Sequence, residues 1–472
     1  MDQTPITIAG EPTTTAESVE VTNPYTQDVI ARVPLCGEAE VARGCSHARE
    51  VLRRGDFAQH ERAAMLDRAS RLIAERSDEL ARGIAAEAGK PLRTAKVEAS
   101  RAVDTFAFAA TEARKLVGEM VPTQASASGA GKIGFALRVP AGVVAAISPF
   151  NFPLNLVAHK LAPAIAAGCP VVLKPAPQTP LTALALVDLL VEAGMPGDWI
   201  SVVTDSRAEA GGPLVEHEVP AVVTFTGSVP VGWGIAANAP RKKVLLELGS
   251  NSPLIVQPDA DIADVAKRAV PASFGFAGQS CIAIQRLLVH QEVHDELVAT
   301  MAEAADQLVV GDPLDEATEV GPMIAPGEID RVQSWVDAAE QAGGRIVAGG
   351  RVEGGVLRPT VVDGLDTGCD LWRKEVFGPV VGIRSYADFD EAIELANDSD
   401  FGLHAGVFTN ELSTALRAAR ELDFGGVLIN EVPTWRADQQ PYGGVRDAGN
   451  TREGPAYAVE EMTTLRFISL QA

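Results

Sequence analysis

A lone cysteine, Cys281, ends a short apolar stretch whose composition suits a crowded reaction centre. The stretch is Phe274-Gly-Phe-Ala-Gly-Gln-Ser-Cys281, and its two glycines allow backbone segments to approach one another closely. Gln279 and Ser280 predict polar surroundings for the sulfur. A free cysteine is most often a small buried hydrophobic residue. A chemical role for Cys281 therefore depends on the residues that accompany it.

A carboxylate upstream is a candidate partner for that sulfur. Glu247 interrupts the strand-like stretch Leu245-Leu-Glu-Leu-Gly-Ser-Asn-Ser-Pro253, and a charge in such a place needs a partner or a chemical role. A thiolate is a nucleophile, and a carboxylate can act as a general base. Two interpretations of Glu247 follow: a salt-bridged acid at a strand end, or the base of a cysteine-dependent reaction.

Two further stretches complete a pattern that resembles the aldehyde dehydrogenase superfamily. Asn151 lies in Ser148-Pro-Phe-Asn-Phe-Pro153, and Glu375 lies in Lys374-Glu-Val-Phe-Gly-Pro379. The resemblance extends from about residue 23 to about residue 462, with the landmarks in the order that the family has.

The resemblance implies a mechanism built on three residues. Cys281 would attack the aldehyde as a thiolate, because the aldehyde carbon gives up hydride only after a tetrahedral adduct has formed. Collapse of the adduct would pass hydride to nicotinamide and leave a thioester, and Glu247 would activate the water that hydrolyses it. The side-chain N–H of Asn151 and the backbone N–H of Cys281 would form the oxyanion hole. Since a free thiol has a pKa of about 8.5, the site must lower that pKa or supply a base.

The resemblance also implies where NAD or NADP binds. Lys174, at a strand end, would hold the adenosine ribose hydroxyls, and Gly227 and Ser228 would place a helix N-terminus at the pyrophosphate. Glu375 would hold the nicotinamide ribose, and Phe377 would flank the nicotinamide ring. The other positions expected at the cofactor are Ser148, Pro149, Phe150, Thr226 and Leu248.

Several positions depart from the family's pattern. Pro177 stands where many NAD-preferring members carry a glutamate for the ribose hydroxyls, and the loss of that carboxylate makes NADP tolerable. Arg207 could attract a 2′-phosphate or be an ordinary solvated arginine, so the choice between NAD and NADP stays open. Ala448 and Thr451 replace the usual serine and glycine near the C-terminus, which affects the local turn geometry.

The aldehyde tunnel that the resemblance implies would be polar and locally cationic. Asn155 and His159 share a helix face, while Arg101 and Arg436 lie on another helix and on a loop. These residues favour a small oxygenated or anionic aldehyde over a fatty or aromatic one, because a buried arginine without a counter-ion is costly. Ser280 is the remaining substrate-binding candidate. The opposite interpretation is that these residues pair with protein acids and leave a neutral pocket.

The same regions look most like the lactaldehyde, glycolaldehyde and phosphonoacetaldehyde dehydrogenase branch. We therefore expect a hydrolytic aldehyde dehydrogenase that produces a carboxylate. One alternative is an acylating enzyme that passes the acyl group to coenzyme A, which the presence of Glu247 disfavours. A dehydrogenase of apolar aldehydes is a second alternative. A non-catalytic protein on this fold is a third, and an intact set of Cys281, Glu247 and Asn151 disfavours it.

Bulk properties limit the class of protein. A chain of 472 residues is too long for one ordinary core and predicts two or three domains. The net charge of −23 disfavours nucleic acid or an anionic membrane as a partner. The N-terminus shows no signal-peptide pattern, and the longest apolar run, residues 161–173, is too short to span a bilayer. The scattered cysteines form no CxxC pair, which predicts a reduced, cytoplasmic protein without a metal site.

The elements that must position these residues alternate between strand and helix. In residues 140–248 and again in residues 250–457, short apolar strands separated by helices predict doubly wound parallel sheets, which bind ligands at the carboxyl ends of their strands. The first region lacks the G-x-G-x-x-G fingerprint, as aldehyde dehydrogenases do. Residues 1–35 predict extended, turn-rich structure, and one helical run is expected from about Glu38 to Gly89.

The predicted fold class is therefore α/β, with the aldehyde dehydrogenase-like arrangement of two doubly wound parallel-sheet domains and a small β oligomerisation domain. A discontinuous dinucleotide-binding domain would comprise residues 1–118 and 141–249, and a catalytic domain would comprise residues 250–457. Residues 119–140 and 458–472 would form the oligomerisation domain. The tail alternates like a strand without a neighbour, so we expect it to pair with another subunit in a homodimer or homotetramer.

Overall fold

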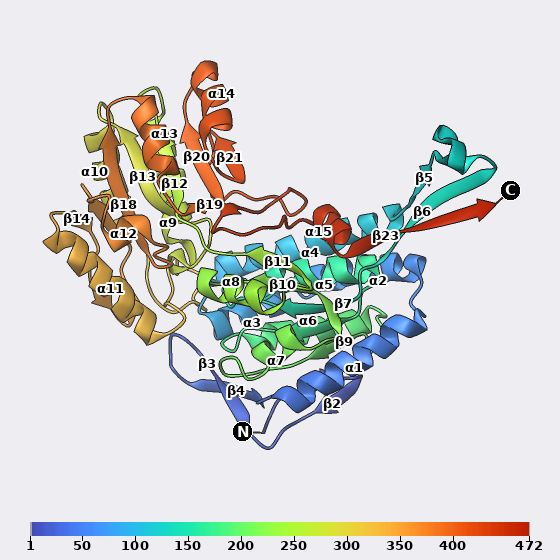
Figure 1. The fold of residues 1–472 in the computed structure, drawn as a ribbon. Coiled ribbons are helices and arrows are strands. Elements are labelled where there is room, and N and C mark those ends of the chain that lie inside the picture. The colour runs from blue at the N-terminus through green and yellow to red at the C-terminus, as the bar shows by residue number, and fades with distance from the viewer. Residues whose placement is uncertain (1, 472) are drawn as a thin grey trace.

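The computed structural model describes residues 2–471, which form two lobes, each built around its own sheet and hydrophobic core (Figure 1). A narrow three-stranded arm projects from one lobe, beside the C-terminal end of the chain (Figure 1). Within residues 2–471, no helix is long and apolar enough to cross a membrane.

The first sheet is parallel and has the strand order β11-β10-β7-β8-β9. Its five strands lie within residues 140–248, where alternating strands and helices were predicted: β7 (Val143–Ile147), β8 (Val171–Lys174), β9 (Ile200–Val202), β10 (Pro220–Thr226) and β11 (Lys243–Glu247). Every residue of β7 is buried, as expected for a strand covered by helices on both faces. The helices that follow the strands are α5 (Asn155–Ala167), α6 (Pro180–Glu192), α7 (Gly211–Glu216) and α8 (Val229–Asn238).

The second sheet has the order β14-β17-β18-β13-β12-β20-β21 and is parallel except at β14, which pairs antiparallel with β17. Its strands are β12 (Ser252–Val256), β13 (Ile284–His290), β14 (Arg345–Ala348), β17 (Thr360–Asp363), β18 (Val380–Tyr386), β20 (His404–Phe408) and β21 (Gly426–Ile429). Its helices are α9 (Ile262–Phe274), α10 (His294–Gln307), α11 (Pro326–Gln341), α12 (Asp370–Arg373), α13 (Phe389–Asn397) and α14 (Leu412–Glu421). Two short pairs lie outside it: β15 (Val352–Glu353) with β16 (Val356–Leu357), and β19 (Phe401–Gly402) with β22 (Val445–Arg446).

The N-terminal region is more regular than the sequence predicted. The turn-rich segment forms two antiparallel pairs: β1 (Ile6–Ile8) with β2 (Glu11–Thr13), and β3 (Ser18–Thr22) with β4 (Val29–Pro34). The expected single helical run is three helices, α1 (Glu38–Arg54), α2 (Gln59–Glu75) and α3 (Ser77–Ala88), and a longer helix, α4 (Leu92–Lys115), follows them. The first break falls at Gly55, whose φ of 58° ends α1 in the left-handed conformation that glycine adopts without strain.

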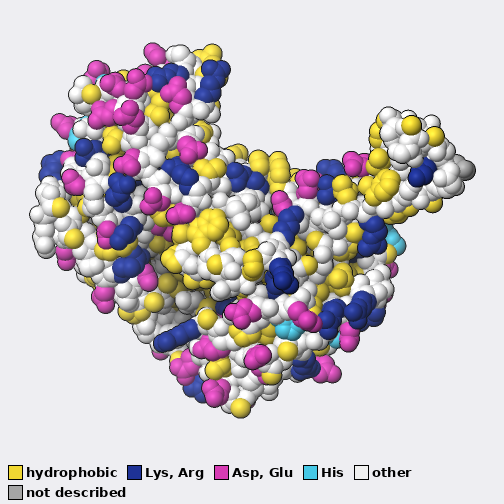
Figure 2. Space-filling model, viewed as in Figure 1, with side chains coloured by type: hydrophobic (Ala, Val, Ile, Leu, Met, Phe, Trp, Pro, Cys, Tyr) yellow, Lys and Arg dark blue, Asp and Glu magenta, His cyan; other side chains and the backbone are white. Residues whose placement is uncertain are grey.

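The structure gives the C-terminal tail a strand partner within the same chain, in the arm. Its strand order is β23-β6-β5, formed by β5 (Glu119–Val121), β6 (Lys132–Pro140) and β23 (Thr463–Gln471). The tail strand β23 pairs along its whole length with β6 of the same chain, from Thr463↔Pro140 to Gln471↔Lys132, so it does not need another subunit to supply a first partner. Its outer edge carries exposed apolar side chains, including Phe467 at 55% exposure, and Figure 2 shows hydrophobic side chains gathered on the arm. Before β23, α15 (Pro455–Glu461) packs on α4 and α5.

A buried ion pair connects the N-terminal helices to the loops between the lobes. The ammonium of Lys90 contacts the carboxylate of Glu98 on α4, and both side chains are almost fully shielded from solvent. The second oxygen of Glu98 accepts the backbone N–H groups at the start of α5, from Leu154 at 2.9 Å and Asn155 at 3.1 Å. The ammonium also lies 4.6 Å from the ring centroid of Phe276 in η3 (Gly275–Gly278), the turn before Cys281.

We expect Lys90→Met to lower the free energy of unfolding by about 3–5 kcal/mol, because it leaves a buried carboxylate without its counter-ion. Guanidinium denaturation of the purified variant measures this loss. The matched control is Lys96→Met on α4, where the lysine side chain is 43% exposed and its ammonium lies 3.3 Å from Glu316. The control should change stability by less than about 1 kcal/mol, and equal losses in the two variants would contradict the role given to the buried pair.

Candidate active site

A cleft of about 800 Å³ lies where the strands of the first sheet end and loops of the second lobe approach them. All ten positions predicted to contact a cofactor line this cleft: Ser148, Pro149, Phe150, Lys174, Thr226, Gly227, Ser228, Leu248, Glu375 and Phe377. Asn151 and Cys281 line it as well. The structure therefore brings the predicted cofactor positions and two of the three predicted catalytic residues to one surface.

Cys281 follows a tight turn that ends at a glycine. Gly278 has a φ of +67°, and a Cβ there would lie 2.0 Å from the carbonyl oxygen of Gly378, so no other residue fits without a backbone shift. The sulfur packs against a small apolar cluster formed by Ile282, Leu403, Tyr442 and Ala448. The expectation of polar surroundings is therefore wrong in part. The side-chain oxygen of Gln279 instead accepts the backbone N–H of Ile324 at 2.9 Å.

The environment of Cys281 keeps its thiol protonated. Burial raises the pKa of this thiol to about 12, and the nearby acids Glu375 and Glu247 act in the same direction. The hydroxyl of Tyr442, whose oxygen lies 2.8 Å from the sulfur, acts in the opposite direction, as does Arg436. At neutral pH the sulfur needs a base before it can act as a nucleophile.

Glu247 ends β11 and is 4% exposed. Among residues 2–471, neither of its carboxylate oxygens has a hydrogen-bond partner, so the interpretation of Glu247 as a salt-bridged strand-end acid is wrong. Burial raises the pKa of this carboxyl well above its usual range, and the negative charge of Glu453 adds to the increase. Arg436 and Lys160 oppose it. A carboxylate whose oxygens have no other partner is free to take and return a proton.

Asn151 connects the loop after β7 to the loop that carries Cys281. Its side-chain nitrogen donates to the backbone oxygen of Gln279 at 2.9 Å, and its side-chain oxygen is buried without a partner among residues 2–471. A primary amide has two N–H groups, so one hydrogen remains to donate toward an oxygen formed beside the sulfur.

The residues at the carboxyl end of the first sheet fit a phosphate-bearing nucleotide. Lys174 ends β8, and its ammonium lies 2.8 Å from Asp205, a buried acid that the sequence analysis missed. Ser228 precedes α8, so the N-terminal N–H groups of that helix begin at the cleft. The hydroxyl of Ser148 lines the cleft and is buried without a partner among residues 2–471, as expected for a group that hydrogen-bonds to a ligand.

Glu375 and Phe377 lie on the second lobe's side of the cleft. Glu375 accepts the backbone N–H of Ser250 at 2.9 Å, and burial raises the pKa of its carboxyl to about 7. Phe377 has a φ of +46°, an unusual conformation for an aromatic residue. Its ring packs edge-to-face on Phe150, with centroids 5.8 Å apart. Glu375 and Phe377 therefore form one wall of the cleft, opposite the strand ends of the first sheet.

Three of the predicted substrate residues converge on one acid that the sequence analysis did not include. The carboxylate of Asp438 accepts from Arg101 at 2.8 Å and from Asn155 at 3.0 Å, and it lies 3.0 Å from the ring of His159. Burial lowers the pKa of His159, so the imidazole is neutral at physiological pH.

The second predicted arginine also has an acidic partner. Arg436 donates to Glu453 at 2.9 Å, and its guanidinium lies 3.7 Å from the ring centroid of Tyr442. Of the two interpretations of the tunnel arginines, pairing with protein acids is the one that the structure shows for both. The Nε of Arg436 is buried and has no partner among residues 2–471. Ser280, the remaining candidate, lies directly before Cys281 and is 9% exposed.

Lys160 is a further charged residue that the sequence analysis missed. It follows His159 on α5, a helix in which every residue is buried, and its ammonium donates to Thr224 at 3.2 Å and to Thr226 at 2.7 Å. A lysine inside a mostly apolar helix was the available signal, because a buried ammonium needs partners or a role.

Comparisons with known proteins place the chain among aldehyde-oxidising enzymes. A model of the aldehyde dehydrogenase family matches residues 11–468. A 3-sulfolactaldehyde dehydrogenase of Priestia aryabhattai is 44% identical, over 98% of this chain and 97% of its own. A lactaldehyde dehydrogenase of Methanococcus maripaludis is 36% identical, over 96% of this chain and 97% of its own.

Solved structures agree with this assignment. Aldehyde dehydrogenase 21 of Physcomitrella patens, in complex with its reaction product succinate, has a TM-score of 0.95 at 38% identity and covers 99% of this chain and 98% of its own. The glyceraldehyde-3-phosphate dehydrogenase GapN of Methanocaldococcus jannaschii, complexed with NADP, has a TM-score of 0.92 at 35% identity and covers 97% of this chain and 100% of its own.

Arg207 is the cleft residue that bears on the choice of cofactor. Its side chain is exposed and lines the cleft on the same side as Lys174. We expect Arg207→Ala to raise the Kd for NADP about tenfold, equivalent to about 1.4 kcal/mol, and to leave the Kd for NAD unchanged, because only NADP carries a 2′-phosphate. Fluorescence titration with NADPH and NADH measures both constants. The control is Arg241→Ala, at an exposed position outside the cleft. An unchanged Kd for NADP would make Arg207 an ordinary solvated arginine.

Proposed function

Because the chain belongs to the aldehyde dehydrogenase family, we propose that it oxidises a small polar or anionic aldehyde to its carboxylate, with NAD or NADP as the hydride acceptor. The observation that carries the proposal is the unpartnered, buried carboxyl of Glu247 near the cysteine-bearing cleft. A purely structural acid would have a hydrogen-bond partner, whereas a base that must meet water and substrate needs free oxygens.

In the proposed mechanism each residue acts through a group described above. The thiol of Cys281 passes its proton to the carboxylate of Glu247, and the sulfur attacks the aldehyde carbon to form a thiohemiacetal. The free N–H of Asn151 donates to the developing oxyanion. Bound NAD(P) supplies the acceptor for the hydride that the carbon loses, which leaves a thioester on Cys281. Glu247 then releases the thiol's proton to solvent and takes a proton from the water that attacks the thioester. The tetrahedral intermediate collapses by breaking its C–S bond, whose electron pair goes to sulfur, and Glu247 returns its proton to the thiolate as the acid leaves.

The substrate class rests on the names of relatives and on the arginines. The relatives' names include 3-sulfolactaldehyde, glyceraldehyde-3-phosphate and, as a product, succinate. Each of these carries an anionic group away from the reacting carbon, while lactaldehyde is small and hydroxylated. Arg101 is 22% exposed, and the Nε of Arg436 is buried without a partner among residues 2–471. Since a guanidinium has five donors, Arg101 can bind an additional oxygen while it remains paired with its acid.

Assembly and location complete the proposal. The open edge of β23 and its exposed apolar side chains support a homodimer or homotetramer formed through the arm. A cytoplasmic location is supported by five free cysteines, since proteins kept in a reducing compartment rarely form disulfides.

A substrate panel tests the proposed class. With NAD and NADP in parallel, we expect kcat/KM for 3-sulfolactaldehyde, lactaldehyde, glycolaldehyde, phosphonoacetaldehyde or succinic semialdehyde to exceed that for hexanal by tenfold or more, about 1.4 kcal/mol of transition-state preference. Arg101→Met should lower the values for the anionic aldehydes more than the value for glycolaldehyde. If hexanal is the best substrate, the substrate proposal is wrong and family membership stands.

The role of Glu247 is tested by Glu247→Gln. We expect kcat to fall by about 10²–10⁴, the range of general-base contributions. One equivalent of reduced cofactor per subunit should still appear in the first turnover, but more slowly than in the unmodified enzyme, because Glu247 also takes the thiol proton. Stopped-flow absorbance resolves this burst from the slow hydrolysis that follows. The control is Cys281→Ala, which should give no burst. If coenzyme A accelerates turnover of the unmodified enzyme and an acyl-coenzyme A accumulates, the acylating alternative replaces the hydrolytic proposal.

A further inference from the structure

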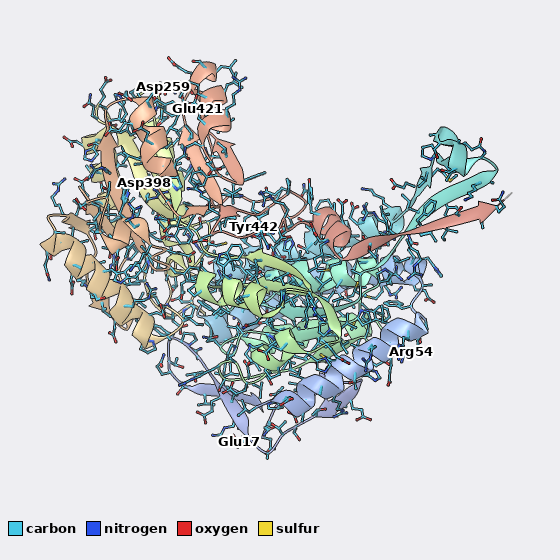
Figure 3. All side chains as sticks on the ribbon, in the orientation of Figure 1. Glu17, Arg54, Asp259, Asp398, Glu421 and Tyr442 are labelled. Atoms are coloured by element: carbon cyan, nitrogen blue, oxygen red, sulfur yellow. The ribbon has the colours of Figure 1, made fainter. Side chains whose placement is uncertain are left out.

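The hydroxyl of Tyr442 is buried against the reactive sulfur. Tyr442 is 2% exposed, and its oxygen lies 2.8 Å from the sulfur of Cys281. Figure 3 labels this residue near the junction of the two lobes. Within residues 2–471, the sulfur is the hydrogen-bond partner of this hydroxyl, and burial of a hydroxyl without a partner is costly. The contact is therefore a defined hydrogen bond and not an incidental approach.

The protein holds the ring of Tyr442 from several sides. The guanidinium of Arg436 lies 3.7 Å from the ring centroid, and the ring of His404 packs edge-to-face with centroids 5.0 Å apart. The backbone N–H of Tyr442 donates to the backbone oxygen of Glu453 at 3.2 Å. These contacts fix the direction of the hydroxyl before any substrate enters.

The hydroxyl of Tyr442 stays protonated and can donate a hydrogen bond. Burial raises the pKa of Tyr442 well above its ordinary value, and the charges of Cys281 and Glu247 act in the same direction. The phenol therefore stays neutral at physiological pH. The positive charge of Arg436 above the ring face opposes the increase and makes the O–H a stronger donor.

We propose that Tyr442 is a further catalytic residue whose O–H donates a hydrogen bond to the sulfur of Cys281 whenever that sulfur carries negative charge. The proposal rests on the proposed function, in which Cys281 is the nucleophile. It assigns to Tyr442 a chemical contact with a reacting atom, in addition to its packing in the apolar cluster with Ile282, Leu403 and Ala448.

The sulfur is negatively charged at two points of the reaction. When the thiol of Cys281 has passed its proton to Glu247, the O–H of Tyr442 points to the thiolate. When the tetrahedral intermediate of thioester hydrolysis collapses, the C–S bond breaks and its electron pair goes to sulfur, so the same O–H stabilises the leaving thiolate. The proton of Tyr442 stays on its oxygen in both steps.

The other groups that face the sulfur cannot replace this donor. Glu375 and Glu247 are acids and raise the pKa of the thiol, and the charge of Arg436 acts on it without a direct hydrogen bond. Tyr442 is the neutral donor in contact with the sulfur. Loss of the hydroxyl would leave the thiolate with the full cost of burial and no compensating hydrogen bond.

The test is the rate at which iodoacetamide alkylates Cys281 in the full-length protein, followed by mass spectrometry of the peptide that carries it. We expect Tyr442→Phe to raise the pKa of the thiol by about one unit. The alkylation rate at pH 8 should then fall about three- to tenfold, because the thiolate fraction falls tenfold and its greater basicity recovers part of the loss. Thioester hydrolysis, measured in single turnovers, should slow as well.

The matched control is Tyr386→Phe. The hydroxyl of Tyr386 is buried and donates to the backbone oxygen of Val256 at 2.8 Å, so the control also removes a buried hydrogen bond, at a site without contact to Cys281. Its alkylation rate should equal that of the unmodified protein. If Tyr442→Phe also leaves the alkylation rate at pH 8 unchanged, Tyr442 only packs and the proposal is overturned.

A second measurement tests the hydrogen bond without removing the hydroxyl of Tyr442. Biosynthetic replacement of the four tyrosines by 3-fluorotyrosine makes each phenol a stronger donor with little change in size. The alkylation rate of Cys281 at pH 8 should rise, and the rise should disappear when Tyr442→Phe is added. An unchanged or lower rate in the fluorinated protein counts against the hydrogen bond. Retention of aldehyde oxidation by Cys281→Ala would instead overturn the proposed function.

Discussion

A buried contact between Lys90 and Glu98 connects three segments that lie far apart in the sequence. The glutamate holds the first N–H groups of α5, which follow the loop of Asn151, while the lysine lies over the ring of Phe276 in the turn that leads to Cys281. Because a buried charge is tolerated only when its partners are in place, the pair requires the helical layer, the Asn151 loop and the cysteine turn to assemble together. The position of the Asn151 amide relative to the Cys281 sulfur therefore depends on the Lys90–Glu98 pair.

The charged side chains around the reaction centre, Glu247, Glu453 and Arg436, are almost fully buried. Around Cys281, burial raises the pKa of Glu247 above its usual range, and Arg436 pairs with Glu453. In such surroundings each proton transfer changes the local field strongly, since little solvent screens it. Neutral donors aimed at fixed points, such as the amide of Asn151 and the phenol of Tyr442, then stabilise negative charge without adding a permanent charge of their own.

The features that could be predicted from the sequence are those encoded in local patterns or implied by the resemblance to the family. The five strands of the first sheet, the cysteine turn and the ten residues that line the cleft all stand in short stretches with recognisable spacing. The counter-ions of the predicted arginines could not be found in this way, because Asp438 and Glu453 reach them only through the folded loops. The same holds for the tail strand, whose alternation predicted a neighbour but could not identify β6 as that neighbour. Contacts of this kind arise from tertiary packing, which no local window contains.

The pairing of β23 with β6 has a consequence for the growing chain on the ribosome. β6 is synthesised more than 300 residues before its partner β23. Throughout most of translation β6 therefore has one unpaired edge, and the apolar side chains of the arm, including Ile133 and Leu137, lie without their final neighbours. Such an edge is a site of aggregation and of chaperone binding, and the arm is completed only after β23 has been made.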